Sequence, residues 1–253
     1  MFASHPINII NVIAGAVAIT VSILILRKDV RATLNLLFFY SLCAWGISLV
    51  FNGLNFLYKH PTTGAGVIRD IVSGAGSIAS FLIFATAFSM FKGEHYLKKW
   101  YVNFPLIILA FVNTIIGVIF DGVVYDSESG LNTGTGIKTT QDNAWVLIFL
   151  YLIPVVMIIL ANIYFAKTRK EVDDPIVKKR ILFVILGFTL IVLGVLVFAL
   201  NGVVDEIRPD SPWEIVFWIF ATIFWIAGPI LQLIGFNLGK ISTKEEEEEE
   251  PTP

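Results

Sequence analysis

The sequence predicts an all-α fold: a polytopic membrane protein that forms a bundle of seven transmembrane helices. The first observation is composition, because 56% of the 253 residues are hydrophobic and only 15% are charged, against about 25% in an ordinary soluble domain. The mean hydropathy is +0.79. The second observation is that seven stretches of 20 to 27 residues contain no Asp, Glu, Lys or Arg. So few charges cannot cover a soluble surface, which excludes soluble enzymes, disordered chains and disulfide scaffolds.

Each stretch is long enough to cross a membrane, since a hydrocarbon core of about 30 Å needs about 20 residues of helix. Lipid offers the backbone no hydrogen-bond partners, so these segments must form helices. The sequence lacks the short segments of alternating polarity that a membrane β-barrel needs. We expect helices at about residues 7–26, 32–58, 66–92, 100–121, 143–167, 175–204 and 213–239.

The first and third elements carry their own signals. Residues 1–6 contain no Lys or Arg, so we expect a retained first helix rather than a signal peptide. In the third element, Ser73 lies four residues before Ser77, and Gly76 four before Ser80. Small residues at this spacing let helices approach closely, so we expect the third helix to be central in the bundle.

The segment that follows the fourth element, residues 121–142, is rich in Gly, Thr and Asn. We favour a solvated flexible loop here over a small hairpin or lid. The sixth element begins with Asp174 and Pro175, which are typical N-cap and first-turn residues of a helix.

Prolines mark the fifth and seventh elements. Pro154 and the pair Gly228-Pro229 lie at the midpoints of their charge-free stretches. A proline there removes a backbone hydrogen bond and bends the helix. One interpretation is a static bend, which membrane helices tolerate. The functional hypothesis is that these three residues act as hinges.

The chain divides into a membrane domain at residues 1–240 and an acidic tail at residues 241–253. The tail contains Glu245–Glu250, and six adjacent carboxylates repel one another, so we expect it to be disordered.

The basic residues predict orientation. One set of connections, together with the tail, holds 14 of the 18 Lys and Arg residues, and the other set holds four. By the positive-inside rule, the N-terminus lies outside and the C-terminus in the cytoplasm of a multi-pass cell-membrane protein. Membrane lipid is the expected surrounding, and the basic inner loops are candidates to meet a cytoplasmic signalling partner. The net charge of −2 argues against a nucleic-acid partner.

Polar residues near the outer helix ends suggest a ligand site. Asn52, Asn55, Asp121 and Glu206 fall around an expected outward-facing cavity. We expect the ligand between the outer halves of the third, sixth and seventh helices, in a cavity of roughly 300 Å³, with its rim formed by Arg69, Asp70, Asn201 and Asp205. Asn201 and Asp205 are four apart and share a helix face. The alternative is a polar collar that only marks the bilayer boundary. The ligand itself is unknown.

The sequence lacks the residues that several kinds of chemistry require. The seventh stretch, 215–239, contains no Lys, so it offers no amine for a retinal Schiff base. The histidines, His5, His60 and His95, belong to no metal-binding motif. We therefore expect no catalytic residue, no metal, no cofactor and no enzyme activity.

The chain resembles the membrane region at the N-terminus of many prokaryotic histidine kinases, over roughly residues 5–240. The resemblance is carried by the seven-helix topology, by Trp45 in the second helix and by a run at the third-helix exit, Phe84-Ala-Thr-Ala-Phe88-Ser-Met-Phe-Lys-Gly-Glu94. The resemblance implies a seven-helix sensory module. Because no transmitter domain follows, we expect a stand-alone receptor or sensor. The alternative is a small-solute or lipid transporter whose path uses the proline-containing fifth and seventh helices.

Overall fold

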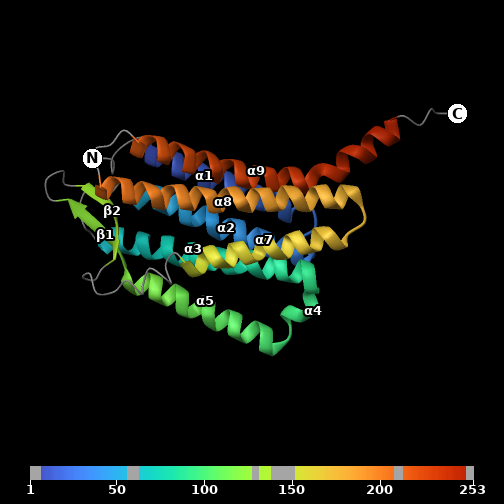
Figure 1. The fold of residues 1–253 in the computed structure, drawn as a ribbon, viewed down its shortest axis with the longest axis horizontal. Coiled ribbons are helices and arrows are strands. Elements are labelled where there is room, and N and C mark those ends of the chain that lie inside the picture. Colours follow the sequence, from blue (N-terminus) through green and yellow to red (C-terminus); the bar gives the residue numbers. More distant parts are fainter. Residues whose placement is uncertain (1–6, 56–62, 127–130, 138–151, 208–212, 249–253) are drawn as a thin grey trace.

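The computed structural model describes residues 7–55, 63–126, 131–137, 152–207 and 213–248. Long helices run side by side along one axis of the molecule (Figure 1). These helices are α1 (Ile7–Leu26), α2 (Thr33–Asn55), α3 (Thr63–Lys92), α5 (Trp100–Phe120), α7 (Ile153–Glu171), α8 (Pro175–Ile207) and α9 (Trp213–Glu248). The shorter elements are the one-turn helix α4 (Glu94–Leu97) and the strands β1 (Asp121–Asp126) and β2 (Leu131–Ile137).

Six helices in the described part of the chain are long and apolar enough to cross a membrane, namely α1, α2, α3, α5, α8 and α9. Their outer faces carry large apolar side chains, such as Phe104 and Phe111, which are 60% and 64% exposed. Soluble monomers rarely expose such extended apolar surface. The chain is therefore a multi-pass helical membrane protein. Residues 138–151, which precede α7, lie outside the described residues, so the count of seven crossings stays a prediction.

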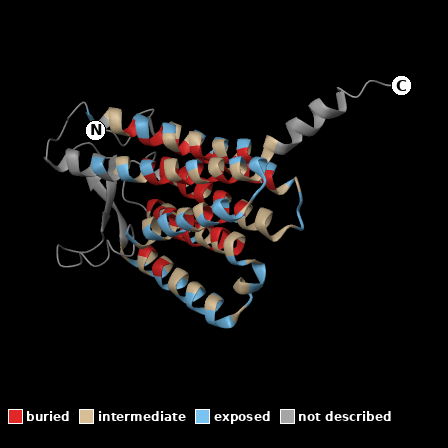
Figure 2. Cartoon of the chain, turned by 45° about the vertical axis from the view of Figure 1, so that its right-hand side comes forward, coloured by how far each residue is buried: buried red, intermediate tan, exposed pale blue. Residues whose placement is uncertain are grey.

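Six helices close a ring in the order α1, α2, α3, α7, α8, α9, and α9 packs back against α1. α5 lies outside this ring and packs mainly against α3, as its position at the edge of the bundle also shows (Figure 1). The burial of each membrane segment agrees: 56% of the α3 segment is buried but only 11% of the α5 segment. Buried residues gather in the middle of the bundle, and the long face of α5 is largely exposed or intermediate (Figure 2). The expected central place of the third helix is confirmed.

Strands β1 and β2 form an antiparallel hairpin, in which Asp121 pairs with Ile137 and Asp126 with Leu131. The prediction of a flexible loop is therefore wrong over these strands. The β-branched and aromatic run Val123, Val124 and Tyr125 favours a strand, and this signal was outweighed by the glycines. Within the described residues, the hairpin is the only departure from an all-helical chain. It contacts the starting end of α3 and the final end of α5.

The hairpin defines one end of the bundle, which we call the hairpin end. The opposite end, which we call the basic end, holds the α1–α2, α3–α5 and α7–α8 connections (Figure 1). α1 begins at the hairpin end and α9 finishes beyond the basic end.

Glycines bring neighbouring helices into close contact. A Cβ atom on Gly46 of α2 would lie 2.7 Å from the Gly15 carbonyl oxygen of α1, and a Cβ on Gly228 of α9 would lie 2.7 Å from the Gly187 carbonyl oxygen of α8. Helices in lipid associate largely through such packing of small residues. Gly228, a hinge candidate in the sequence, is thus a packing contact between α8 and α9.

The helix bounds match the expected ones within a few residues for α1, α2, α3 and α5. Asp174 also caps α8 as predicted, because its Oδ1 accepts hydrogen bonds from the backbone N–H of Ile176 at 2.7 Å and Val177 at 3.3 Å. α8 and α9 run past the expected ends at 204 and 239, to Ile207 and Glu248. Hydropathy predicts where a helix leaves the lipid but not where the helix ends. A helix can continue beyond the lipid, because adding one more hydrogen-bonded residue to an existing helix is easy.

Candidate functional site

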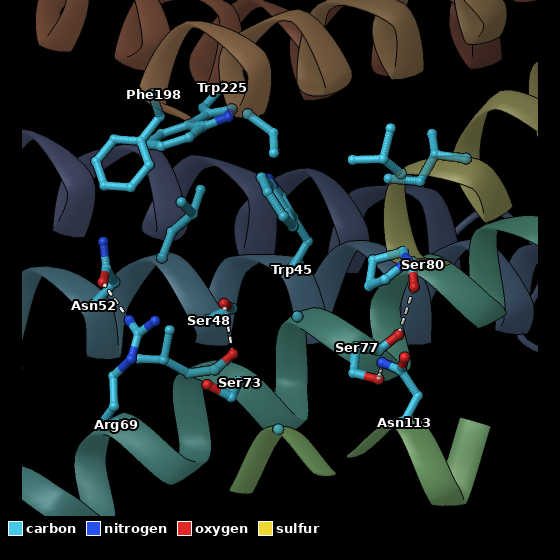
Figure 3. A pocket seen from close by; sticks show the side chains of 18 residues that line it. Trp45, Ser48, Asn52, Arg69, Ser73, Ser77, Ser80, Asn113, Phe198 and Trp225 are labelled. Atoms are coloured by element: carbon cyan, nitrogen blue, oxygen red, sulfur yellow. Dashed lines mark hydrogen bonds between the residues drawn. The ribbon is translucent and has the colours of Figure 1, made fainter. Parts of the chain in front are cut away.

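A cavity of about 160 Å³ lies inside the bundle, between α3 and the helices around it. It extends along α3 from Arg69, near the hairpin end, to Ser80 (Figure 3). Its lining residues are Trp45, Ser48, Leu49, Asn52, Arg69, Val72, Ser73, Gly76, Ser77, Ser80, Asn113, Gly117, Pro154, Val155, Ile158, Val195, Phe198 and Trp225. The wall therefore combines α2, α3, α5, α7, α8 and α9.

The polar part of the wall comes from α2, α3 and α5. On α3, Arg69, Ser73, Ser77 and Ser80 follow one another at intervals of four, four and three residues, so they share one face of the helix. Ser48 and Asn52, four residues apart on α2, face this stripe, and Asn113 of α5 completes it (Figure 3).

Hydrogen bonds hold this polar wall in place. The Arg69 Nη1 donates to Asn52 Oδ1 at 3.2 Å, and the Ser48 hydroxyl donates to the Val72 carbonyl oxygen at 2.9 Å, so both bonds join α2 to α3. Asn113 Nδ2 donates to Ser77 Oγ at 2.7 Å and joins α5 to α3. Arg69 is only 7% exposed. A buried guanidinium needs such polar neighbours, because an isolated buried charge is very unfavourable.

The opposite wall is apolar and aromatic. α7 supplies Val155 and Ile158, and α8 supplies Val195 and Phe198. The Trp45 and Trp225 rings meet edge to face at 6.1 Å between centroids, and Phe198 lies 5.8 Å from Trp225. The two tryptophans thus pack the bundle and also form part of the cavity wall.

Buried polar atoms of lining residues that have no hydrogen-bond partner within the described structure include Trp45 Nε1, Trp225 Nε1 and Asn113 Oδ1. Trp45, Trp225 and Asn113 are 9%, 3% and 1% exposed. The two indole N–H groups are donors, and the amide oxygen is an acceptor. A buried polar group without a partner is unfavourable by about 1–3 kcal/mol. The cavity therefore offers hydrogen bonds that water or a ligand can complete.

Of the four predicted rim residues, Arg69 lines the cavity. Asp70 is half-buried and is not among the lining residues. Asn201 and Asp205 belong to α8, but their side chains lie outside the described residues, so their part in the rim stays a prediction. The cavity is smaller than the roughly 300 Å³ expected for a drug-sized ligand, and it involves α2, α5 and α7 in addition to the three helices expected.

Ser48, Asn113 and the aromatic wall were not predicted from the sequence. Asn113 carried a usable signal, because an amide within an apolar membrane segment usually faces the protein interior. Ser48 carried none, since a lone serine in such a segment can satisfy its hydroxyl on its own helix.

The prolines occupy two different settings. Pro154 lies at the beginning of the described part of α7 and lines the cavity. Pro229 lies inside α9, four residues after Trp225 of the cavity wall. The hinge role of both residues and of Gly228 stays a prediction.

A layer of phenylalanines closes the bundle beyond the cavity. Phe38 of α2, Phe165 of α7 and Phe188 of α8 are at most 2% exposed, and their ring centroids lie 5.7–6.2 Å apart. Phe188 falls on α8 between Val195 of the cavity and Val184, which lines a second pocket of about 200 Å³ toward the basic end. This inner pocket is lined by Phe38, Met90, Val177, Arg180, Ile181, Val184, Gly235 and Phe236.

The fold and these two spaces define a class of protein: a multi-pass helical membrane protein with a small amphipathic cavity inside its bundle. In the described ranges, no three His, Cys, Asp or Glu side chains gather where they could hold a metal ion. No known family model matches the sequence, and no curated protein matches it significantly.

Proposed function

We propose that this protein is a receptor or sensor of the cell membrane, whose small ligand binds in the interior cavity and whose basic end meets a cytoplasmic partner. The observation that carries the proposal is the cavity itself, which combines a buried arginine, unpaired polar atoms and an aromatic wall. A binding pocket needs this combination of apolar lining and a few placed polar groups. We propose no catalytic residue and no enzyme activity.

In this proposal the hairpin end faces outward. The basic end then lies in the cytoplasm, where the α1–α2 turn, the α3–α5 connection and the end of α7 present exposed bases, namely Arg31, Lys92, Lys98, Lys167, Arg169 and Lys170. Such an excess of Lys and Arg is typical of cytoplasmic loops.

The signal would pass through the helices rather than through an open path. The buried phenylalanine layer separates the cavity from the inner pocket. α9 lines both spaces, through Trp225 and through Phe236, and Pro229 lies between these residues. A ligand that binds one arrangement of α9 more tightly than another shifts the population toward that arrangement. Movement of the basic end then changes what a partner encounters.

A matched pair of variants tests the site. Val155 lines the cavity, whereas its neighbour Val156 is not among the lining residues and is 39% exposed. We expect benzoate, benzyl alcohol or benzylamine, at concentrations far above the dissociation constant, to raise the unfolding temperature of the wild type in lipid nanodiscs, because binding to the native state stabilises it. Val155→Phe should abolish the increase by filling the cavity, and Val156→Phe should keep it. Equal responses of the two variants would contradict the proposed site.

A second candidate is a transporter of small solutes or lipids. The specific observation in its favour is the inner pocket, which lies beyond the phenylalanine layer, so that two spaces face opposite ends of the bundle. Alternating access requires such a closed layer that opens on either side. Uptake of a labelled probe into proteoliposomes, with a rate that increases in Phe188→Ala, would favour this candidate; binding without uptake would favour the receptor.

A further inference from the structure

The inner half of the cavity, which lies away from Arg69, is polar without being charged. It follows α3 from Ser77 to Ser80, and Asn113 of α5 and Trp45 of α2 border it (Figure 3). The stretches of α2, α3, α5, α7, α8 and α9 at this depth all belong to the described residues. None of the described side chains that line this half is ionisable. A charged group placed here would lack a counter-charge, which is very unfavourable in a buried site.

Two hydrogen-bonding atoms in this half have no partner within the described structure. Asn113 donates through Nδ2 to Ser77 Oγ at 2.7 Å, and its Oδ1 is left as an unpaired acceptor. Trp45 Nε1 is an unpaired donor. Both side chains are buried, at 1% and 9% exposed. Because an unpaired buried donor or acceptor is unfavourable, a molecule that offers both a donor and an acceptor is favoured over one of the same size that offers neither.

The aromatic wall supplies apolar contact to the same space. Trp225 contributes its ring, because its Nε1 lies against Gly194 of α8. The Trp45 ring meets the Trp225 ring edge to face at 6.1 Å between centroids, and Ile158 of α7 also lines the cavity. A compact apolar body packs well against such rings, whereas a fully polar solute would leave them without an apolar partner.

The volume sets the size of the molecule. The cavity holds about 160 Å³, which is close to the roughly 150 Å³ of an engineered cavity that binds benzene. A single ring with one small polar substituent fits, or a chain of similar volume. A sugar–nucleotide or an intact lipid does not.

From these restrictions we infer that the ligand is a small uncharged molecule with an apolar body and a group that both donates and accepts hydrogen bonds, as in an alcohol, a phenol or a simple amide. Its donor is directed to Asn113 Oδ1, its acceptor to Trp45 Nε1, and its body lies against the Trp45 and Trp225 rings. This inference rests on the proposed function, because it names the ligand class of the same cavity.

Probes that share one ring test the inference. Binding of labelled benzyl alcohol to the full chain in zwitterionic nanodiscs is measured with toluene, benzoate and benzylamine as competitors. Empty nanodiscs measure how much benzyl alcohol and toluene enter the lipid, so that their affinities refer to concentrations in lipid. We expect benzyl alcohol to bind about tenfold more tightly than toluene, because only the alcohol forms hydrogen bonds. Benzoate and benzylamine should displace it only at aqueous concentrations about tenfold above that of unlabelled benzyl alcohol.

A matched pair of variants tests the hydrogen bond to Asn113. Asn113→Leu removes the amide at similar size, so it should lower benzyl alcohol affinity about fivefold and leave toluene affinity unchanged or higher. Asn103→Leu, at an exposed asparagine of the same helix, is the control and should change neither affinity. If Asn113→Leu does not fold, Trp45→Phe decides, because it removes the N–H and keeps an aromatic ring: it should also lower the preference for benzyl alcohol over toluene.

The outcomes separate the inference from the proposed function. Equal affinities of the wild type for benzyl alcohol and toluene, with both lost in Val155→Phe, would overturn the hydrogen-bonding assignment and leave the cavity as a ligand site. Displacement by benzoate or benzylamine as readily as by unlabelled benzyl alcohol would overturn the assignment of an uncharged ligand. No binding of any probe, or binding that survives Val155→Phe, would overturn both the inference and the proposed site.

Discussion

Individual glycines set how closely α8 and α9 approach. Gly187 and Gly194 are seven residues apart on α8, and Gly228 and Gly235 are seven apart on α9. Residues at this spacing lie along one side of a helix that packs against a neighbour. Cβ atoms at these four positions would meet the facing helix at 2.4 to 2.9 Å, which is too close for any side chain. The Trp225 indole that forms the cavity wall also occupies the space that Gly194 leaves.

The clearest residue-scale prediction concerns Gly228. Gly228→Ala places a methyl group against the Gly187 backbone, so we expect a loss of about 1–3 kcal/mol in the free energy of unfolding. Gly66→Ala is the matched control, because a Cβ at Gly66 meets nothing within 4 Å; it should be neutral or stabilising by up to about 1 kcal/mol. Unfolding in detergent by increasing denaturant measures both. Equal stabilities of the two variants would show that α8 and α9 separate easily.

Two residues of the cavity wall, Arg69 and Asn52, were predicted from the sequence. Arg69 was identifiable because an arginine at a membrane boundary on a helix rich in small residues is unusual. The contacts of Asn113 with Ser77 and of Trp45 with Trp225 depend on which helices are neighbours. Hydropathy along a chain contains no information about lateral neighbours, so these parts of the wall were not predictable.

Among the elements, α9 connects the cavity to the basic end. Trp225 lines the cavity, Pro229 interrupts the backbone hydrogen bonds one turn later, and Phe236 lines the inner pocket. Lys28, in the turn after α1, donates a hydrogen bond to the Phe236 carbonyl oxygen. The basic end of α9 is thus attached to the connection that carries the first cluster of bases.

Pro229→Ala tests whether α9 bends in response to the ligand. The substitution restores a backbone N–H, so we expect benzyl alcohol affinity to change little while the response of the basic end is lost. The readout is the distance between spin labels at Lys170→Cys on α7 and Asn237→Cys on α9, in a Cys43→Ser background. Benzyl alcohol should change this distance by about 1–2 Å or more in the parent and not in Pro229→Ala. A change of the same size in both would show that Pro229 is a static bend.

The elements also show the limits of pattern reasoning. Charge-free stretches located α1, α2, α3, α5, α8 and α9, because lipid requires about 20 apolar residues for each crossing. The hairpin was only the less favoured alternative to a flexible loop, since its strands are short and contain glycine. The extension of α9 to Glu248 could not be predicted from hydropathy.

At the scale of the whole molecule, the ring of six helices with α5 outside it explains where the cavity lies. α3 packs against α2, α5 and α7, so its polar stripe meets polar residues of α2 and α5. α8 and α9 close the ring through glycine contacts and present aromatic groups to the same space. An amphipathic cavity follows from this order of helices, because the polar and apolar walls come from opposite sides of the ring.

The orientation of this ring in the membrane is the last prediction. The basic end carries most of the Lys and Arg residues, and moving them across the bilayer during insertion is unfavourable. In a Cys43→Ser background, we expect a membrane-impermeant maleimide to label Thr133→Cys in the hairpin of intact cells, and to label Lys170→Cys at the end of α7 only after the membrane is opened. The reverse pattern would place the hairpin end, near which Arg69 lies, in the cytoplasm, and the proposed ligand would then be intracellular rather than external.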